Sequence, residues 1–182
     1  MRVLMAINDA TYGKAIIDFA GAAFTKPGTL FKLLHVAEPS SVGEAVTAIH
    51  GPGINREILE ERVKAGSHLL GEMREHLQAK VGQASPVEVS VVTGTPHQVI
   101  LEAAADWQAD IIIMGAHARK GLSGLIMGSV SMSVMSQANC AVTIVRLPEE
   151  VLKDEEVPAK KATAQKKVKA KEQAIVRNRA AY

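Results

Sequence analysis

One stretch of the chain, residues 110–146, restricts the possible folds more than any other part of the sequence. It opens with a short apolar run that ends at Gly115, and Gly128 follows thirteen residues later. Apolar residues then recur every four positions up to Asn139, which predicts the buried face of a helix, and residues 141–145 form a new apolar run. The stretch therefore predicts a strand, a long loop between two glycines, a helix and a second strand.

The rest of the chain repeats this alternation of short apolar runs and helical periodicity. Strands are predicted at residues 2–7, 30–36, 87–93, 110–114 and 141–145. Helices are expected between them, the longest over residues 56–81. Thr95 and Gln98 predict a capping box, with Pro96 at the first helical position. Since parallel strands need the long crossovers that helices supply, the chain is predicted to form an α/β fold with a five-stranded parallel sheet.

The predicted helix behind Gly128 offers a place for an anion. The first N–H groups of a helix lack intrahelical partners and carry the positive end of the helix dipole, so a phosphate is stabilised there. Gly128 gives the backbone room to approach a phosphate, and Ser129 either donates its hydroxyl or only caps the helix. Open parallel sheets bind ligands at the carboxyl ends of their strands, which is where this helix starts.

This segment resembles the universal stress protein family, whose nucleotide-binding members carry Gly, two residues, Gly, nine residues, and then Gly with Ser or Thr. Gly115 opens the pattern here, Gly128 and Ser129 close it, and Ala118 stands in place of the second glycine. The resemblance runs from Met1 to about Arg146 and includes the segments RVLMAIND, LLHVAEP and NCAVTIVR.

The resemblance implies an open Rossmann-like sheet in strand order 3-2-1-4-5 with helices on both faces. It also implies a binding site for ATP or another adenine nucleotide, with any Mg²⁺ held mainly by the phosphates. A homodimer through residues 141–145 is implied as well, and that apolar run would be an exposed sheet edge in a monomer. The implied nucleotide contacts are Ile7, Asn8, Asp9, Val36, Met114, Gly115, His117, Ala118, Arg119, Gly128, Ser129, Val130 and Ser131.

Two departures from the family pattern keep alternatives open. Asn8 stands where many relatives have aspartate, and Asn8 with Asp9 could simply end a strand and cap the next turn. The Cβ of Ala118 obstructs the close backbone approach that a glycine permits, although Arg119 and Lys120 add positive charge nearby. The alternatives to a nucleotide-binding regulatory domain are therefore a nucleotide-free dimeric interaction protein of the same fold and a slow ATPase.

No motif of a dedicated hydrolase or metal enzyme occurs in the sequence, so a binding protein is favoured over an enzyme. Residues 37–55, rich in glycine and proline, are expected either to cover the site or only to connect two elements. Cys140 is the only cysteine, which excludes an intrachain disulfide and suggests a buried small residue.

The domain is expected to span residues 1–147, followed by a basic tail over residues 148–182. Eight basic side chains and one acidic side chain fall within residues 157–182, whereas the whole chain has a formal charge of only +2. The tail is predicted to be disordered or marginally helical, and its charge could attract nucleic acid or an acidic surface. No apolar run is long enough to span a membrane and no secretory signal is recognisable, so a cytoplasmic protein is expected.

Overall fold

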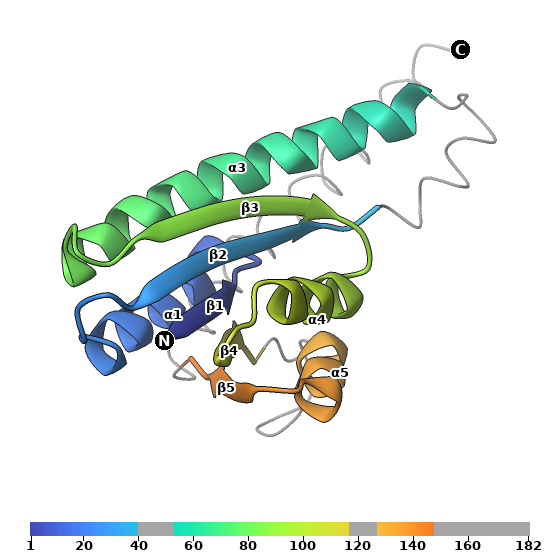
Figure 1. Cartoon of the computed structure of the whole chain (residues 1–182). Coiled ribbons are helices and arrows are strands. Elements are labelled where there is room, and N and C mark those ends of the chain that lie inside the picture. The colour runs from blue at the N-terminus through green and yellow to red at the C-terminus, as the bar shows by residue number, and fades with distance from the viewer. Residues whose placement is uncertain (40–52, 117–126, 148–182) are drawn as a thin grey trace, which may run out of the picture. The chain divides into compact units, whose positions relative to one another are not determined.

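A computed structural model describes residues 1–39, 53–116 and 127–147 (Figure 1). Its centre is a five-stranded parallel sheet in the order β3-β2-β1-β4-β5. The predicted strand order is therefore confirmed. The strands are β1 (Arg2–Ala6), β2 (Leu30–Ala37), β3 (Val87–Thr93), β4 (Ile111–Gly115) and β5 (Ala141–Val145).

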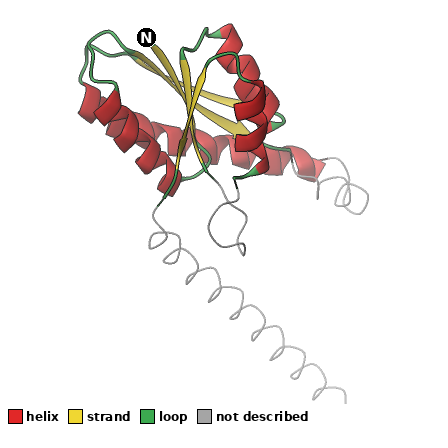
Figure 2. Cartoon of the chain, turned by 90° about the horizontal axis from the view of Figure 1, so that it is seen from below, coloured by secondary structure: helices red, strands yellow, loops and turns green. Residues whose placement is uncertain are grey.

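Helices cover both faces of the sheet, as predicted (Figure 2). One face carries two helices that pack against each other and against the sheet, and the other face carries a second such pair. The first pair is α1 (Ala10–Ala23) and α3 (Gly53–Val81). The second pair is α4 (Pro96–Asp106) and α5 (Ser129–Gln137). Among the described helices, none combines the length and the apolar character needed to cross a membrane.

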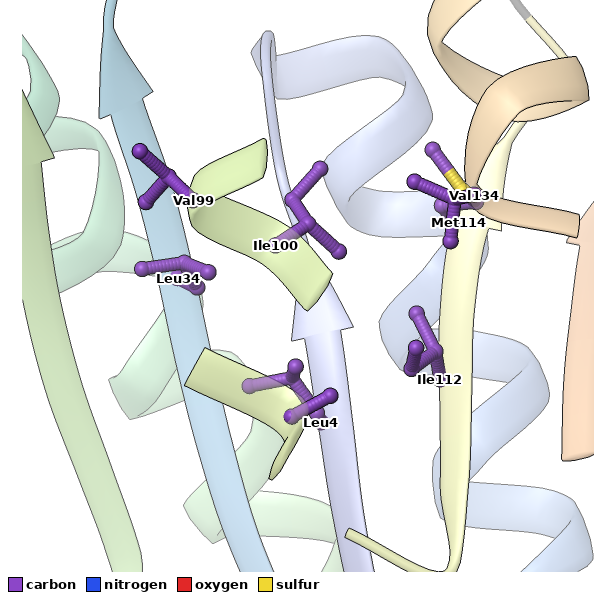
Figure 3. Packing of buried hydrophobic residues seen from close by; sticks show 8 residues of the cluster. Leu4, Leu34, Val99, Ile100, Ile112, Met114 and Val134 are labelled. Atoms are coloured by element: carbon purple, nitrogen blue, oxygen red, sulfur yellow. The ribbon is translucent and has the colours of Figure 1, made fainter. Parts of the chain in front are cut away.

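The core between the sheet and α4/α5 is built from alternate strand residues. Successive side chains of a strand point to opposite faces, so Leu4, Leu34 and Ile112 all reach the same side, where they meet Ile100 of α4 and Val134 of α5 (Figure 3). Each of these five side chains is at most 3% exposed. Burying an aliphatic side chain of this size contributes about 1.5–3 kcal/mol, so the three central strands hold the two helices firmly in place.

The register of the central strands decides where a site can form. Ala6, the last residue of β1, is paired with Leu34 of β2 on one side and with Met114 of β4 on the other. The chain leaves β1 toward α1, on one face of the sheet, whereas β4 leads toward α5 on the other face. This divergence is a topological switch point, the place where open α/β sheets bind their ligands.

Two local predictions were wrong. Thr95 occupies the N-cap position of α4 and Pro96 follows at the start of the helix, but the Thr95 side chain makes no capping hydrogen bond. Thr95 and Gln98 are both exposed, so water can satisfy the first N–H groups of α4 without a capping box. Cys140 is only partly buried, because it precedes β5 at the edge of the sheet, where the strand has a neighbour on one side only.

Candidate functional site

A cavity of about 240 Å³ lies at the switch point, and we call it the crevice. The carboxyl ends of β1, β2 and β4 form one wall, and the first turns of α4 and α5 close it. Five other residues that line it were not predicted as site residues: Ala6, Leu34, Glu38, Pro96 and Ile100. Nine of the predicted nucleotide contacts line it: Ile7, Asn8, Val36, Met114, Gly115, Gly128, Ser129, Val130 and Ser131.

The remaining four predicted contacts are not among the described residues that line the crevice. His117, Ala118 and Arg119 lie outside the described residues. Asp9 caps α1 instead, since its Oδ1 accepts a hydrogen bond of 2.8 Å from the backbone N–H of Tyr12. The capping role that was weighed for the Asn8–Asp9 pair thus applies to Asp9, whereas Asn8 is exposed and lines the crevice.

The first turn of α5 presents its free backbone donors at the crevice. Gly128 is the N-cap residue, and the backbone N–H of Met132 is the one that donates to the Gly128 carbonyl, at 3.0 Å. The N–H groups of the residues in between, Ser129 to Ser131, have no intrahelical acceptor, as at any helix start. Because Gly128 is the cap, Ser129 is the first helical residue, and its exposed side chain makes no hydrogen bond with the part of the chain that the structure describes. The Ser129 hydroxyl is thus available to a ligand.

Ser131 plays a different part from Ser129, although both line the crevice. Its side chain is 2% exposed, and its Oγ donates a hydrogen bond of 3.0 Å to the carbonyl of Gly115. This bond ties the first turn of α5 to the last residue of β4. The hydroxyl of Ser131 therefore fixes the geometry of the anion-binding turn, and the residue can meet a ligand through its backbone N–H.

Gly115 is required by packing. A Cβ on this residue would lie 2.8 Å from Cγ and 3.1 Å from Cε1 of Tyr12, and closer still to Cδ1. The Tyr12 ring is buried, and its hydroxyl donates a hydrogen bond of 2.8 Å to the carbonyl of Ala116. Tyr12 and Ser131 thus hold the Gly115–Ala116 backbone from two sides, just where the chain leaves β4.

Sequence reasoning did not single out Tyr12. Its only signal was its spacing, because Tyr12, Ile16 and Ala20 recur every four residues and are all buried on one face of α1. That pattern indicates a core residue and says nothing of the hydroxyl. The partner of this hydroxyl lies 104 residues away in the sequence.

A second hollow, of about 300 Å³, adjoins the crevice on the side of α3. The two spaces share the residues Asn8, Val36, Glu38 and Pro96. The second hollow is lined in addition by His35 of β2 and by Arg62 of α3, whose guanidinium donates a hydrogen bond to the carbonyl of Glu38. The end of β2 is thereby fixed to α3 at the mouth of the crevice.

The described part of the crevice has few charged side chains. Glu38 is the one charged residue among the described residues that line it, so an anion there is stabilised by backbone N–H groups and the helix dipole. Residues 1–39, 53–116 and 127–147 contain no cluster of three His, Cys, Asp or Glu side chains that could hold a metal ion.

Residues 1–146 match the model of the universal stress protein family. Universal stress protein A homolog 2 of Coxiella burnetii is 33% identical over 151 residues, which cover 80% of this chain and 94% of that protein. Universal stress protein Sll1388 of Synechocystis sp. is 30% identical over 158 residues, which cover 80% of this chain and 97% of that protein.

Solved structures show the same fold. The hypothetical protein MJ0577 has a TM-score of 0.67 at 24% identity, over 81% of this chain and 96% of its own. A universal stress protein in complex with cAMP has a TM-score of 0.56 at 18% identity, over 80% and 95% of the two chains. A family protein from Arabidopsis thaliana with AMP bound has a TM-score of 0.55 at 20% identity, over 82% and 94%. Since the family model spans most of the sequence, this chain belongs to the universal stress protein family.

Proposed function

We propose that the protein binds an adenine nucleotide in the crevice and that occupancy of the crevice serves as a regulatory signal. The observation that carries the proposal is the first turn of α5, where free backbone N–H groups and the Ser129 hydroxyl line the same cavity as Ile7, Asn8 and Val36. An anionic group and a flat apolar group can thus be bound side by side, which are the two parts of a nucleotide.

The ligands of similar structures support this choice. Relatives of the same fold have been solved with cAMP and with AMP. The described residues enclose about 240 Å³, slightly less than the roughly 300–1,000 Å³ of ordinary small-molecule pockets. We propose ATP as the ligand, with Mg²⁺ bound chiefly by its phosphates. Ala118 and Arg119, which are predicted to lie near the phosphates, are outside the described residues.

We further propose a homodimer that forms through β5. This strand is the last in the sheet, and the residues of β5 are half-buried or exposed. Two large apolar side chains of the adjacent helix α5 are also exposed, Met132 at 49% and Met135 at 44%. An apolar strand at an open sheet edge favours pairing with a second chain. Sedimentation velocity over a range of concentrations tests this: a species of twice the chain mass is expected.

Nucleotide binding is tested first on freshly purified protein. The protein is heat-denatured, and the supernatant is analysed by anion-exchange chromatography with absorbance at 260 nm. The emptied protein is then titrated with ATP and Mg²⁺ in a calorimeter. Adenine nucleotide released near one per chain, or rebinding at micromolar concentration, supports the proposal. A clean supernatant with no heat of binding at millimolar ATP contradicts it and favours a nucleotide-free interaction protein.

A pair of charge variants then locates the phosphate. Ser129→Asp places a carboxylate at the first position of α5, where it suits the helix dipole and preserves folding, but it repels a phosphate bound there. We expect its affinity for ATP to fall at least about tenfold, equivalent to about 1.4 kcal/mol. Ser136→Asp is the control for the added charge, since Ser136 is exposed near the other end of the same helix, and its melting temperature is measured as well because a carboxylate there opposes the helix dipole. Equal affinity of the two variants would contradict the placement of the phosphate.

The third possibility is slow ATP hydrolysis. It is tested by measuring the release of inorganic phosphate from ATP by the wild-type protein and the two variants. Turnover that exceeds that of the Ser129→Asp variant would indicate hydrolysis in the crevice.

The basic tail, the predicted contact for nucleic acid or an acidic surface, lies outside the described residues. The cytoplasmic location stays a prediction.

A further inference from the structure

We propose that His35 is a positioning residue of the crevice: its ring holds the carbonyl of Ile7 and so sets the backbone that carries Asn8. This inference rests on the proposed nucleotide site and names a residue that acts on that site without lining the crevice. His35 lies in β2 and faces α3, on the opposite side of the sheet from Leu34.

The end of β1 is held to β2 by two hydrogen bonds. The backbone N–H of Ile7 donates to the carbonyl of Leu34 at 2.9 Å, and Nδ1 of His35 lies 2.8 Å from the carbonyl oxygen of Ile7. A carbonyl oxygen can only accept, so Nδ1 of His35 carries a proton. The structure therefore assigns the tautomer of His35 in its neutral form: the proton is on Nδ1, and Nε2 is the acceptor.

Helix α3 holds the imidazole in this orientation. The ring lies against Gly66, where a Cβ would come within 3.0 Å of Nε2 and 3.1 Å of Cγ of His35, and closer still to Cδ2. Glycine inside a helix is unfavourable, because it loses more backbone entropy on folding than other residues do. Gly66 is nevertheless buried in the middle of α3, and the space it leaves is filled by His35.

The bond matters to the site because Asn8 comes directly after Ile7 in the chain. Ile7 and Asn8 both line the crevice, and Asn8 also lines the adjoining hollow together with His35. Asn8 is exposed, and its side chain makes no hydrogen bond with any part of the chain that the structure describes. The backbone fixes where the Asn8 side chain starts, since it sets the direction of the Cα–Cβ bond, and the peptide that precedes Asn8 is the one whose carbonyl His35 holds.

The test uses two substitutions that differ in where they place a donor. The Nδ2 of an asparagine falls near the position of Nδ1 in histidine, so His35→Asn retains the hydrogen bond to Ile7 but loses the packing on Gly66. His35→Gln carries its donor one bond further out, near the position of Nε2, and loses the bond to Ile7. We expect His35→Gln to weaken ATP affinity about tenfold and His35→Asn to stay within about threefold of the wild-type protein.

A merely structural role predicts the opposite order, because asparagine removes more of the half-buried ring than glutamine does. Equal losses of affinity in the two variants, or a larger loss in His35→Asn, would overturn the proposal. Gly66→Ala provides an independent variant that pushes on the ring without changing it. It should weaken ATP affinity in the wild-type background and have no effect on affinity in the His35→Asn background.

Two NMR measurements separate a failure of this inference from a failure of the proposed function. A long-range ¹H–¹⁵N correlation on the wild-type protein should show the proton of His35 on Nδ1, and a proton on Nε2 alone would overturn the proposal. The backbone amide of Asn8 should shift in His35→Gln and stay near its wild-type position in His35→Asn. Neither measurement needs a nucleotide. Both therefore test the role of His35 even if the crevice binds no nucleotide.

Discussion

Gly115→Ala tests why a glycine must end β4. The usual reason for such a glycine is a left-handed backbone or the close approach of a phosphate. Among the described glycines only Gly28, Gly82 and Gly94 have a positive φ, so backbone conformation does not require glycine at position 115. The new Cβ would instead meet the buried ring of Tyr12, 2.8 Å from its Cγ.

The size of the effect follows from this contact. Ordinary van der Waals contacts of a Cβ fall at 3.4–4 Å, so the ring must move by roughly half an ångström or more. Overpacking of this kind costs about 1–3 kcal/mol. The same movement strains the hydrogen bond from the Tyr12 hydroxyl to the carbonyl of Ala116, worth about 1 kcal/mol. We expect Gly115→Ala to lower the free energy of unfolding by about 2–4 kcal/mol.

Urea denaturation of a double-mutant cycle measures the cost and its cause. Tyr12→Ala removes the ring, so in that background Gly115→Ala should cost less than about 1 kcal/mol. Gly71→Ala is the control for a glycine replacement without a clash, since nothing lies within 4 Å of an added Cβ at this exposed site of α3. It should stabilise the protein by up to about 1 kcal/mol. If Gly115→Ala costs the same with and without Tyr12, the packing explanation is refuted.

Three further predictions concern single side chains. Ser131→Ala should cost about 1–3 kcal/mol in urea denaturation, because the buried carbonyl of Gly115 loses its donor, and a cost below about 0.5 kcal/mol would show that this bond is unimportant. The Lys80 ammonium, with His76 nearby, lowers the pKa of Asp18 below its ordinary value of 3.8. The stabilisation by Asp18 is therefore present above pH 3.8 and lost as the pH falls through its folded pKa, so wild-type and Asp18→Asn melting curves should differ at pH 7 and converge as the pH falls below 3.8. Burial raises the pKa of the Cys140 thiol, with Asp110 adding to the effect, so iodoacetamide at pH 7 should alkylate it more slowly than free cysteine, and an equal rate would contradict this.

The sheet could be predicted because its signal is local. The strand at residues 87–93 was predicted with the bounds that the structure has, and the β2 prediction ended one residue early. Short β-branched and apolar runs between turn residues are typical of strands in a parallel sheet. The strand order itself came from the family resemblance, since the sequence pattern does not say which strands are neighbours.

The sequence predicts where the site lies in the sheet, but not the hydrogen bonds within it. Residues that follow strands meet at one edge of a parallel sheet, which is why most of the predicted contacts gather around one cavity. The bonds of Tyr12 and His35 join residues 104 and 28 positions apart, and the sequence does not show which carbonyl either side chain reaches. The direction of the Ser131 hydroxyl likewise depends on the tertiary structure, because nothing in the sequence distinguishes it from the exposed Ser129.

The position of α5 has a thermodynamic consequence. The helix has nine residues, its first turn lines the crevice, and three residues separate its end from β5 at the sheet edge. A nucleotide and a second copy of the chain would thus act on the two ends of one short rigid element. If the nucleotide tightens dimerisation by some factor, linkage requires that dimerisation tighten nucleotide binding by the same factor. The protein concentration in the cell would then set how much nucleotide the crevice needs, and the nucleotide level would set how much dimer forms.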